Sequence, residues 1–186
     1  IVSLVFFFLV GNIIAQQTPA PKQTTAFSIE GATAHLGNGK VIENSLIMFN
    51  DGKITFVGSA LMKIARQGKV INANGKHVYP GFIATNGSLG LSEVDAVRAT
   101  RDFDEVGNML PHVRSIIAYN AESKVVESLR MNGILMSDTS PRGGTISGTS
   151  SVVQLDAWNW EDAAVKMDNG IHINWPGSFT SGRWWL

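Results

Sequence analysis

The histidines of this chain are its candidates for imidazole ligands of a catalytic metal, but their spacing forms no local metal-binding motif. Metallohydrolases hold a divalent ion with clustered imidazoles and carboxylates and leave one position open for water. No two of the four histidines lie two, three or four residues apart. We therefore interpret each one as a structural or surface residue. They are His35, His77, His112 and His172.

Other forms of catalysis find little support in the residue types. The chain has no cysteine, which excludes disulfides, zinc–thiolate sites and thiol catalysis. It also has no Gly-x-Ser-x-Gly segment of the kind that presents a nucleophilic serine. The charges of fifteen basic and fifteen acidic side chains cancel, so the chain has no excess positive charge to bind the backbone of a nucleic acid. We therefore expect no nucleic acid partner.

A glycine-rich segment at residues 141–148 is a candidate anion-binding loop. It reads Pro-Arg-Gly-Gly-Thr-Ile-Ser-Gly. Backbone N–H groups of such loops can bind anions, and the guanidinium of Arg142 could pair with a carboxylate. The Gly-Lys-Ser/Thr ending of a phosphate-binding P-loop is absent. A simple connector is the favoured interpretation of this segment, and a substrate-facing loop is the alternative.

Residues 69–83 carry the most specific pattern in the chain. They predict a strand, a Gly75-Lys76 turn, and an apolar strand entered through Pro80-Gly81. This stretch resembles the passage by which amidohydrolase-superfamily enzymes run from a small β-sandwich into the first strand of a metal-binding barrel. The family usually continues with Asp-x-His-x-His, whose histidines hold the metal. Here the same positions read Ala-Thr-Asn-Gly-Ser, at residues 84–88.

Asn86 and Ser88 thus stand where the resemblance would place the two histidines. In a parallel barrel, residues at the carboxyl ends of the strands face the active site. Two interpretations remain open: these residues line a substrate pocket, or they cap a strand and begin a loop. Residues 143–151 resemble the loop after the second barrel strand of imidazolonepropionase-like amidohydrolases, which implies a structural or substrate-facing loop. Our substrate-pocket candidates are Asn86, Ser88, Arg142 and Ser147, with no catalytic residue or metal ligand assigned.

The predicted fold is mixed. An antiparallel β-sandwich portion is expected at residues 26–80, and the opening strands and helices of a parallel (β/α)8 barrel at residues 81–186. Asp51-Gly52 between two apolar runs predicts a type I′ hairpin. A helix is predicted over residues 122–132, ended by Gly133 and followed by a buried strand at 134–136. The mixed charges of residues 92–106 predict an exposed helix, or a helix followed by a loop.

The length and the first residues predict an exported fragment. A whole barrel needs about 250 residues, so the 186 residues here are interpreted as the amino-terminal part of a longer protein. Residues 1–15 resemble a secretory signal peptide cleaved near Ala15, followed by a polar linker at residues 16–25. The alternatives are a membrane anchor or a buried strand. Export would place the protein in the periplasm or outside the cell, with no stable membrane span after cleavage.

Tryptophans gather in the last thirty residues, at positions 158, 160, 175, 184 and 185. Exposed indoles can stack on sugar rings, which would suit a carbohydrate-binding protein. We favour a role in covering the core or a partner domain.

The resemblance implies a hydrolase that acts on non-peptide carbon–nitrogen bonds of a small-molecule substrate. In the family, a divalent metal, with zinc first among the candidates, activates the attacking water. Because the first-strand histidines are replaced, the alternative is a non-catalytic pseudoenzyme that binds a partner subunit or forms a homo-oligomer. We expect this fragment to be inactive and poorly soluble on its own.

Overall fold

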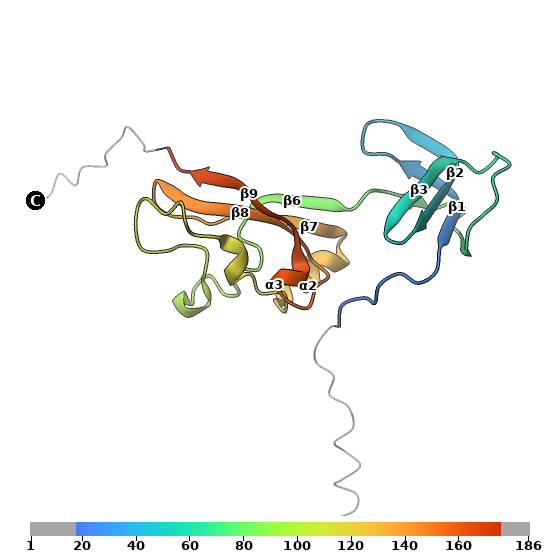
Figure 1. Ribbon diagram of the computed structural model, residues 1–186. Coiled ribbons are helices and arrows are strands. Elements are labelled where there is room, and N and C mark those ends of the chain that lie inside the picture. Colours follow the sequence, from blue (N-terminus) through green and yellow to red (C-terminus); the bar gives the residue numbers. More distant parts are fainter. Residues whose placement is uncertain (1–17, 176–186) are drawn as a thin grey trace, which may run out of the picture. The chain divides into compact units, whose positions relative to one another are not determined.

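The computed structural model describes residues 18–175, which divide into two compact units (Figure 1). Residues 20–81 form the first unit, and residues 82–175 belong to the second. Both are built mainly of β-strands. No helix within residues 18–175 is long and apolar enough to cross a bilayer. The predicted signal peptide at residues 1–15 and the tryptophans at 184 and 185 lie outside the described residues.

The first unit is one five-stranded sheet in the order β3-β2-β1-β4, with β5 also paired to β1. Its strands are β1 (Phe27–His35), β2 (Val41–Asn50), β3 (Lys53–Ser59), β4 (Lys69–Asn72) and β5 (His77–Val78). The pairs β1–β2 and β2–β3 are antiparallel, whereas β4 and β5 pair with β1 in parallel. The prediction of an antiparallel unit is therefore confirmed for β1, β2 and β3 and is wrong for β4 and β5. The segment after β3 returns along the free edge of β1, which makes β4 parallel to it.

The hairpin between β2 and β3 confirms the prediction from its turn residues. Asn50 pairs with Lys53, and the two residues between them have positive φ angles of 50° for Asp51 and 68° for Gly52. A type I′ turn requires positive φ at both central positions, and its twist matches that of the flanking strands. The turn residues thus set the pairing next to the turn, and the register shifts by one residue between Phe49 and Met48.

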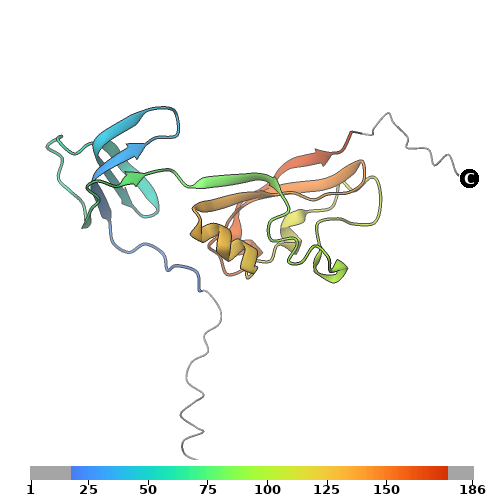
Figure 2. The ribbon, with the colours of Figure 1, turned by 180° about the vertical axis from the view of Figure 1, so that it is seen from behind.

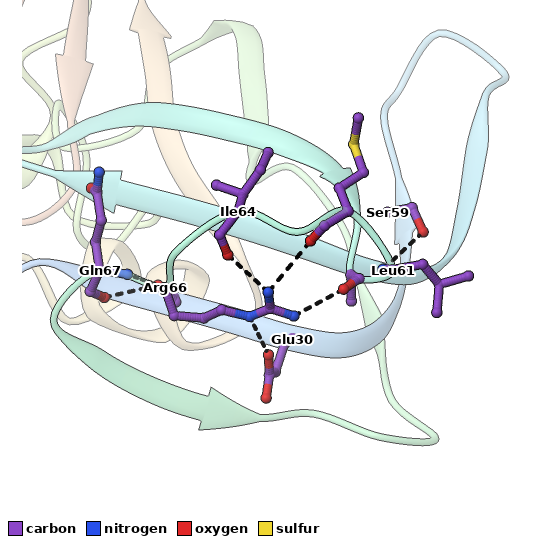
Figure 3. A network of polar contacts seen from close by, with 9 residues as sticks. Glu30, Ser59, Leu61, Ile64, Arg66 and Gln67 are labelled. Carbon is purple, nitrogen blue, oxygen red and sulfur yellow. Dashed lines mark hydrogen bonds and ion pairs between the residues drawn. The ribbon is translucent and has the colours of Figure 1, made fainter.

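The connection from β3 to β4 is organised around the guanidinium of Arg66 (Figure 3). Its Nε donates to Glu30 Oε2 at 2.9 Å, its Nη1 to the carbonyl of Ile64 at 2.9 Å, and its Nη2 to the carbonyl of Ala60 at 2.9 Å. One side chain therefore joins two points of an irregular loop to β1. Charged donors of this kind make stronger hydrogen bonds than neutral ones.

We expect Arg66→Ala to lower the free energy of unfolding by about 1–2 kcal/mol, because it strips loop carbonyls and Glu30 of a charged donor. Urea denaturation monitored by far-ultraviolet circular dichroism measures the loss. Arg66→Lys is the matched control, since it keeps the charge but lacks the fork of donors. A lysine variant as stable as the parent would show that charge alone, and not the fork, holds the loop.

The second unit is a four-stranded sheet in the order β6-β7-β8-β9. Its strands are β6 (Phe82–Gly87), β7 (Ile134–Thr139), β8 (Ile146–Gln154) and β9 (Ala164–Ile173). The pair β6–β7 is parallel, and the other two pairs are antiparallel. The described sheet is therefore mixed and open, with no closed barrel. The reason lies in the connections: β6 reaches β7 through 46 residues that include a helix, whereas β7 and β8 are joined by residues 140–145 alone, enough for a hairpin and too short for a crossover.

The helices of the second unit are short. They are the α-helices α2 (Lys124–Met131) and α3 (Trp160–Ala163) and the 3₁₀ helices η1 (Arg98–Thr100) and η2 (Ser115–Ala118). In Figures 1 and 2, α2 and α3 lie on the same side of the sheet. Ile116 of η2, Val126 of α2 and Val153 of β8 are almost fully buried in the core that forms there. The predicted helix at 122–132 is confirmed, and so is a strand at 134–136. The prediction that this strand is buried is wrong, because Leu135 is 50% exposed.

The helix predicted over residues 92–106 is wrong apart from the single turn of η1. The three valines of this segment, Val94, Val97 and Val106, are 51%, 45% and 94% exposed. A short helix gains most of its stability from packing an apolar face, and this segment packs none of the three. It is held instead by backbone hydrogen bonds of turns, such as Asp102 N–H to the carbonyl of Leu91.

Candidate functional site

The carboxyl ends of the parallel strands β6 and β7 meet at a β-bulge. Ala84 pairs with Ser137 and Gly87 pairs with Thr139, so two residues of β6, Thr85 and Asn86, lie opposite the single residue between them on β7. Asn86 has a positive φ of 54° and is exposed. Asparagine tolerates this left-handed conformation better than most residues, and bulges re-aim side chains at the rims of sheets. The sequence therefore builds an irregular, solvent-facing rim at this point.

Asp138 is the residue of β7 opposite this bulge, and the sequence analysis did not single it out. Its Oδ1 is buried and has no hydrogen-bond partner among residues 18–175. Burying a carboxylate oxygen without a donor costs free energy, so native proteins rarely leave one unsatisfied without a reason. The available signal was a carboxylate two residues after the apolar run Ile134–Met136, near the end of a predicted strand.

Ser88 is half-buried at the edge of a shallow polar hollow that follows β6. The hollow also contains two carboxylates, and both have partners. Glu93 accepts hydrogen bonds from Asn120 Nδ2 and from the hydroxyl of Ser123, each at 3.0 Å, and Asp95 accepts one from Ser92. Because Ser123 is the residue that caps α2, Glu93 joins the loop after β6 to the start of that helix. The lining residues are Ser88, Leu89, Ser92, Glu93, Asp95 and Val125.

Arg142 is exposed and lies beside an aromatic ring. Its guanidinium carbon is 5.9 Å from the centroid of Phe103, and that of Arg101 is 5.7 Å from the same centroid. The backbone N–H of Arg142 donates to the carbonyl of Phe103 at 2.6 Å. These contacts hold the loop after β7 against residues 101–104 and leave the Arg142 side chain at the surface.

Ser147 is buried, and its hydroxyl is engaged with its own loop. It donates to the carbonyl of Gly143 at 2.6 Å and accepts from Asn174 Nδ2 at 2.8 Å. Asn174 also donates to the carbonyl of Gly144 at 2.9 Å. These bonds close residues 143–147 into a compact loop, so the connector interpretation accounts for the hydroxyl. A contact between Ser147 and a substrate stays a prediction.

The four candidate residues lie at one edge of the second sheet without touching as a group. Asn86 is the second-last residue of β6, Ser88 follows the strand, and Arg142 follows β7. Ser147 is near the start of β8, in the part of that strand that extends beyond the end of β7, since Thr139 pairs with Ser151. Within residues 18–175, no hydrogen bond or ion pair joins any two of the four. The arrangement is a set of polar groups at this rim of the sheet, and it lacks the direct contacts of an assembled catalytic centre.

Elsewhere in this unit, Arg114 and Asp168 form a two-pronged ion pair. Arg114 Nε and Nη2 donate to the two carboxylate oxygens at 2.8 Å each, and Thr149 Oγ1 donates to Oδ1 at 3.1 Å. The hydrogen bond from Arg114 holds the pKa of Asp168 below its usual range and raises the pKa of Arg114. Because the pair is solvent-exposed and links the start of η2 to β9, we interpret it as structural.

Residues 18–175 contain no group of three or more histidine, aspartate or glutamate side chains able to hold a metal ion.

The tryptophans in this range differ in how far their side chains are buried. Trp160 packs against the core, as favoured from the sequence, whereas Trp158 and Trp175 are 56% and 89% exposed.

Comparison with known proteins gives one informative likeness. No family model and no curated protein match the sequence. The fold is similar to that of an amidohydrolase from Thermotoga maritima MSB8, with a TM-score of 0.70 and 21% identity over 79% of this chain. The chain spans 38% of the length of that protein. A prolidase complexed with N-methylphosphonate-L-proline shares 20% identity over 61% of this chain and 25% of its own, but its TM-score of 0.41 is too low to bear on the fold.

Proposed function

We propose that this chain forms the amino-terminal part of an amidohydrolase-like enzyme that hydrolyses non-peptide carbon–nitrogen bonds in a small molecule. The observation that carries the proposal is the likeness to an amidohydrolase fold over 79% of the chain. The succession β6–α2–β7, with a parallel pair of strands, supports the further proposal that β6 and β7 open a (β/α)8 barrel. The site would then lie at the carboxyl ends of these strands.

The metal that such chemistry implies does not fit the described residues. A divalent ion, zinc in the first place, would activate the attacking water. Asn86 and Ser88 offer an amide and a hydroxyl, which are poor zinc ligands beside imidazole, and Asp138 is a single carboxylate. The proposal therefore requires ligands from outside residues 18–175. Within the described part, Asn86 and Ser88 would orient the substrate, and the carboxylate of Asp138 would hold a proton or a polar group of the substrate.

A non-catalytic partner-binding subunit is the second candidate. Replacement of both first-strand histidines by Asn86 and Ser88 favours it. So does the apolar surface on the strands of the second unit, where large side chains are between 50% and 65% exposed. A partner subunit or a second copy of the chain could cover this surface. The side chains are Phe82, Ile83, Leu135, Val165, Ile171 and Ile173.

The test is hydrolysis of a panel of lactams, cyclic ureides and N-acylated amines by the purified complete protein of which this chain is proposed to be the amino-terminal part, with and without added Zn²⁺ or Mn²⁺. Asp138→Asn keeps the size of the side chain and removes its charge. We expect it to slow hydrolysis by about 10²-fold or more, the scale of a lost proton-transfer group. Glu161→Gln, at an exposed carboxylate on α3, is the matched control and should leave the rate unchanged.

Two outcomes would contradict the proposal. An Asp138→Asn variant with the parent's rate would remove Asp138 from the site. Absence of hydrolysis with every metal would favour the binding subunit. In that case the double variant Asn86→His, Ser88→His decides whether a latent enzyme remains. If it takes up no metal and stays inactive, the enzymatic interpretation fails.

We also propose export, on the basis of the apolar residues 1–15. Recovery of the protein from the periplasm or the medium, with a new amino terminus near residue 16, is the expected result. Protein retained at full length inside the cell would contradict it.

A further inference from the structure

Three aromatic side chains gather on one exposed part of the first unit. His35 Nε2 and His77 Nδ1 are 2.9 Å apart, and the ring of Tyr79 stacks on that of His35 with centroids 4.3 Å apart and planes inclined by 7°. The sheet explains the grouping. Thr33 pairs with His77 and Ala34 with Val78 in the parallel β1–β5 ladder, and the next residues in this register are His35 and Tyr79. Because side chains alternate between the faces of a strand, His35 lies on the same face as Thr33. Residues far apart in the sequence thus place two imidazoles in contact.

The backbone around the pair is held in place on both strands. Thr33 N–H donates to the carbonyl of Lys76 at 2.9 Å, just before His77. Leu36 N–H donates to the carbonyl of Lys40 at 3.0 Å, just after His35. Stacking on Tyr79 restricts the ring of His35 in addition. Little conformational freedom would therefore be lost if a ligand bound both rings, which favours binding.

The distance between the two nitrogens suits a particular class of metal ion. Imidazole nitrogens bind first-row divalent ions at about 2.0–2.1 Å, so the separation of 2.9 Å corresponds to an angle of about 90° at the metal. That angle belongs to neighbouring positions of a square-planar or tetragonal complex, the geometry of Cu²⁺ and Ni²⁺. A tetrahedral zinc complex needs the nitrogens farther apart. The same order of preference follows from the general affinity series, in which Cu²⁺ stands highest.

We propose that His35 and His77 form a two-histidine binding site for a divalent transition-metal ion, with Cu²⁺ bound most tightly. When the ion binds, the hydrogen between the two nitrogens moves to the other nitrogen of the ring that carries it, so that both neutral imidazoles offer a lone pair to the ion, and water completes its coordination. Tyr79 is a positioning residue that fixes the ring of His35. The site belongs to the first unit and the proposed hydrolytic rim to the second, and the metal-site proposal does not depend on the proposed function.

The experiment is a Cu²⁺ titration of the untagged protein by calorimetry in a weakly coordinating buffer. We expect one site, and either His35→Ala or His77→Ala should weaken it by about 10²-fold, because two-point attachment becomes one-point attachment. His112→Ala, at an exposed histidine of the second unit, is the matched control and should leave the affinity unchanged. Electron spin echo spectroscopy of the bound Cu²⁺ should detect two imidazoles in the parent and one in each single variant.

Single variants that bind Cu²⁺ as tightly as the parent, or one imidazole in the parent spectrum, would overturn the proposal. Zn²⁺ bound more tightly than Cu²⁺ would overturn the geometric argument. Circular dichroism of each variant separates loss of the site from loss of the fold. Should His35→Ala unfold the first unit, His77→Gln provides the same test at the exposed strand β5. None of these results uses hydrolysis, so failure here and failure of the proposed function are distinguishable.

Discussion

Gly148→Ala lowers the free energy of unfolding of the second unit by about 2–6 kcal/mol. Gly148 has a φ of +124°, which side chains rarely adopt, and a Cβ there would lie 2.4 Å from the carbonyl oxygen of Val113. Backbone strain of this kind costs about 1–3 kcal/mol and overpacking a similar amount. Neither the carbonyl of Val113 nor the backbone of residue 148 can move away easily. The adjacent Thr149 donates its N–H to the same carbonyl at 2.8 Å, and β8 is paired with strands on both sides.

Gly133→Ala is the matched control for this prediction, because it separates strain from crowding. Gly133 also has a positive φ, +88°, but its Cβ would meet nothing closer than a ring carbon of Phe82 at 4.0 Å. We expect it to lose only the cost of the left-handed conformation, about 1–2 kcal/mol. Urea denaturation followed by tryptophan fluorescence measures both variants, since Trp160 packs against the core. If both variants lost the same unfolding free energy, the close approach of the alanine Cβ at position 148 to Val113 would add no cost beyond the backbone strain.

Two glycine-containing segments differ in how well the sequence predicted them: the Asp51-Gly52 turn was predicted, whereas the role of Gly148 was not. The Asp51-Gly52 hairpin could be predicted because two neighbouring residues determine the turn. The glycine-rich segment was interpreted as a loop because its glycines suggested backbone freedom. Its last three residues are in fact the start of β8. Gly148 is required there by the close approach of Val113, a contact across 35 positions that no local pattern reveals.

The candidate site likewise has features that could be predicted from the sequence and features that could not. That Asn86 and Ser88 lie near the end of a strand could be predicted from the apolar run before them and the Pro-Gly entry. The bulge that sets Asn86 opposite Asp138 depends on the register of β6 against β7, strands separated by a long connection. The burial of Asp138 Oδ1 is a consequence of that pairing. Sequence therefore suggested the candidate residues Asn86 and Ser88 but gave no sign that Asp138 Oδ1 is buried, because burial depends on the assembled sheet.

Tyr119→Phe is expected to stabilise the second unit by about 1–3 kcal/mol at neutral pH. Tyr119 is 5% exposed, and its hydroxyl has no hydrogen-bond partner among residues 18–175. An unsatisfied buried hydroxyl costs about that amount, whereas the ring that packs against the core stays in place in the variant. Most core substitutions destabilise a protein, so a gain in stability is a discriminating result. Urea denaturation at pH 7 measures it.

The effect of Tyr119→Phe should grow with pH. Burial raises the pKa of Tyr119 to about 12 in the folded chain, whereas the unfolded chain ionises near the ordinary value of 10.0. Between these values the unfolded state binds fewer protons than the folded state, so the stability of the parent falls as pH rises from about 10 to about 12. Phenylalanine has no proton to lose. The variant's advantage should therefore increase by up to about 3 kcal/mol across this window and stay constant below it.

Tyr79→Phe is the matched control, because Tyr79 is the other tyrosine of the chain and is 59% exposed. It should leave the alkaline slope unchanged. Unfolding measured at pH 8, 10 and 11 distinguishes the two variants before lysine titration dominates. Parallel curves for the parent and Tyr119→Phe would mean that the hydroxyl ionises as freely in the folded chain as in the unfolded one, and hence that water or another donor reaches it. The core beneath η2 would then be open to solvent, and the predicted gain at neutral pH would be lost for the same reason.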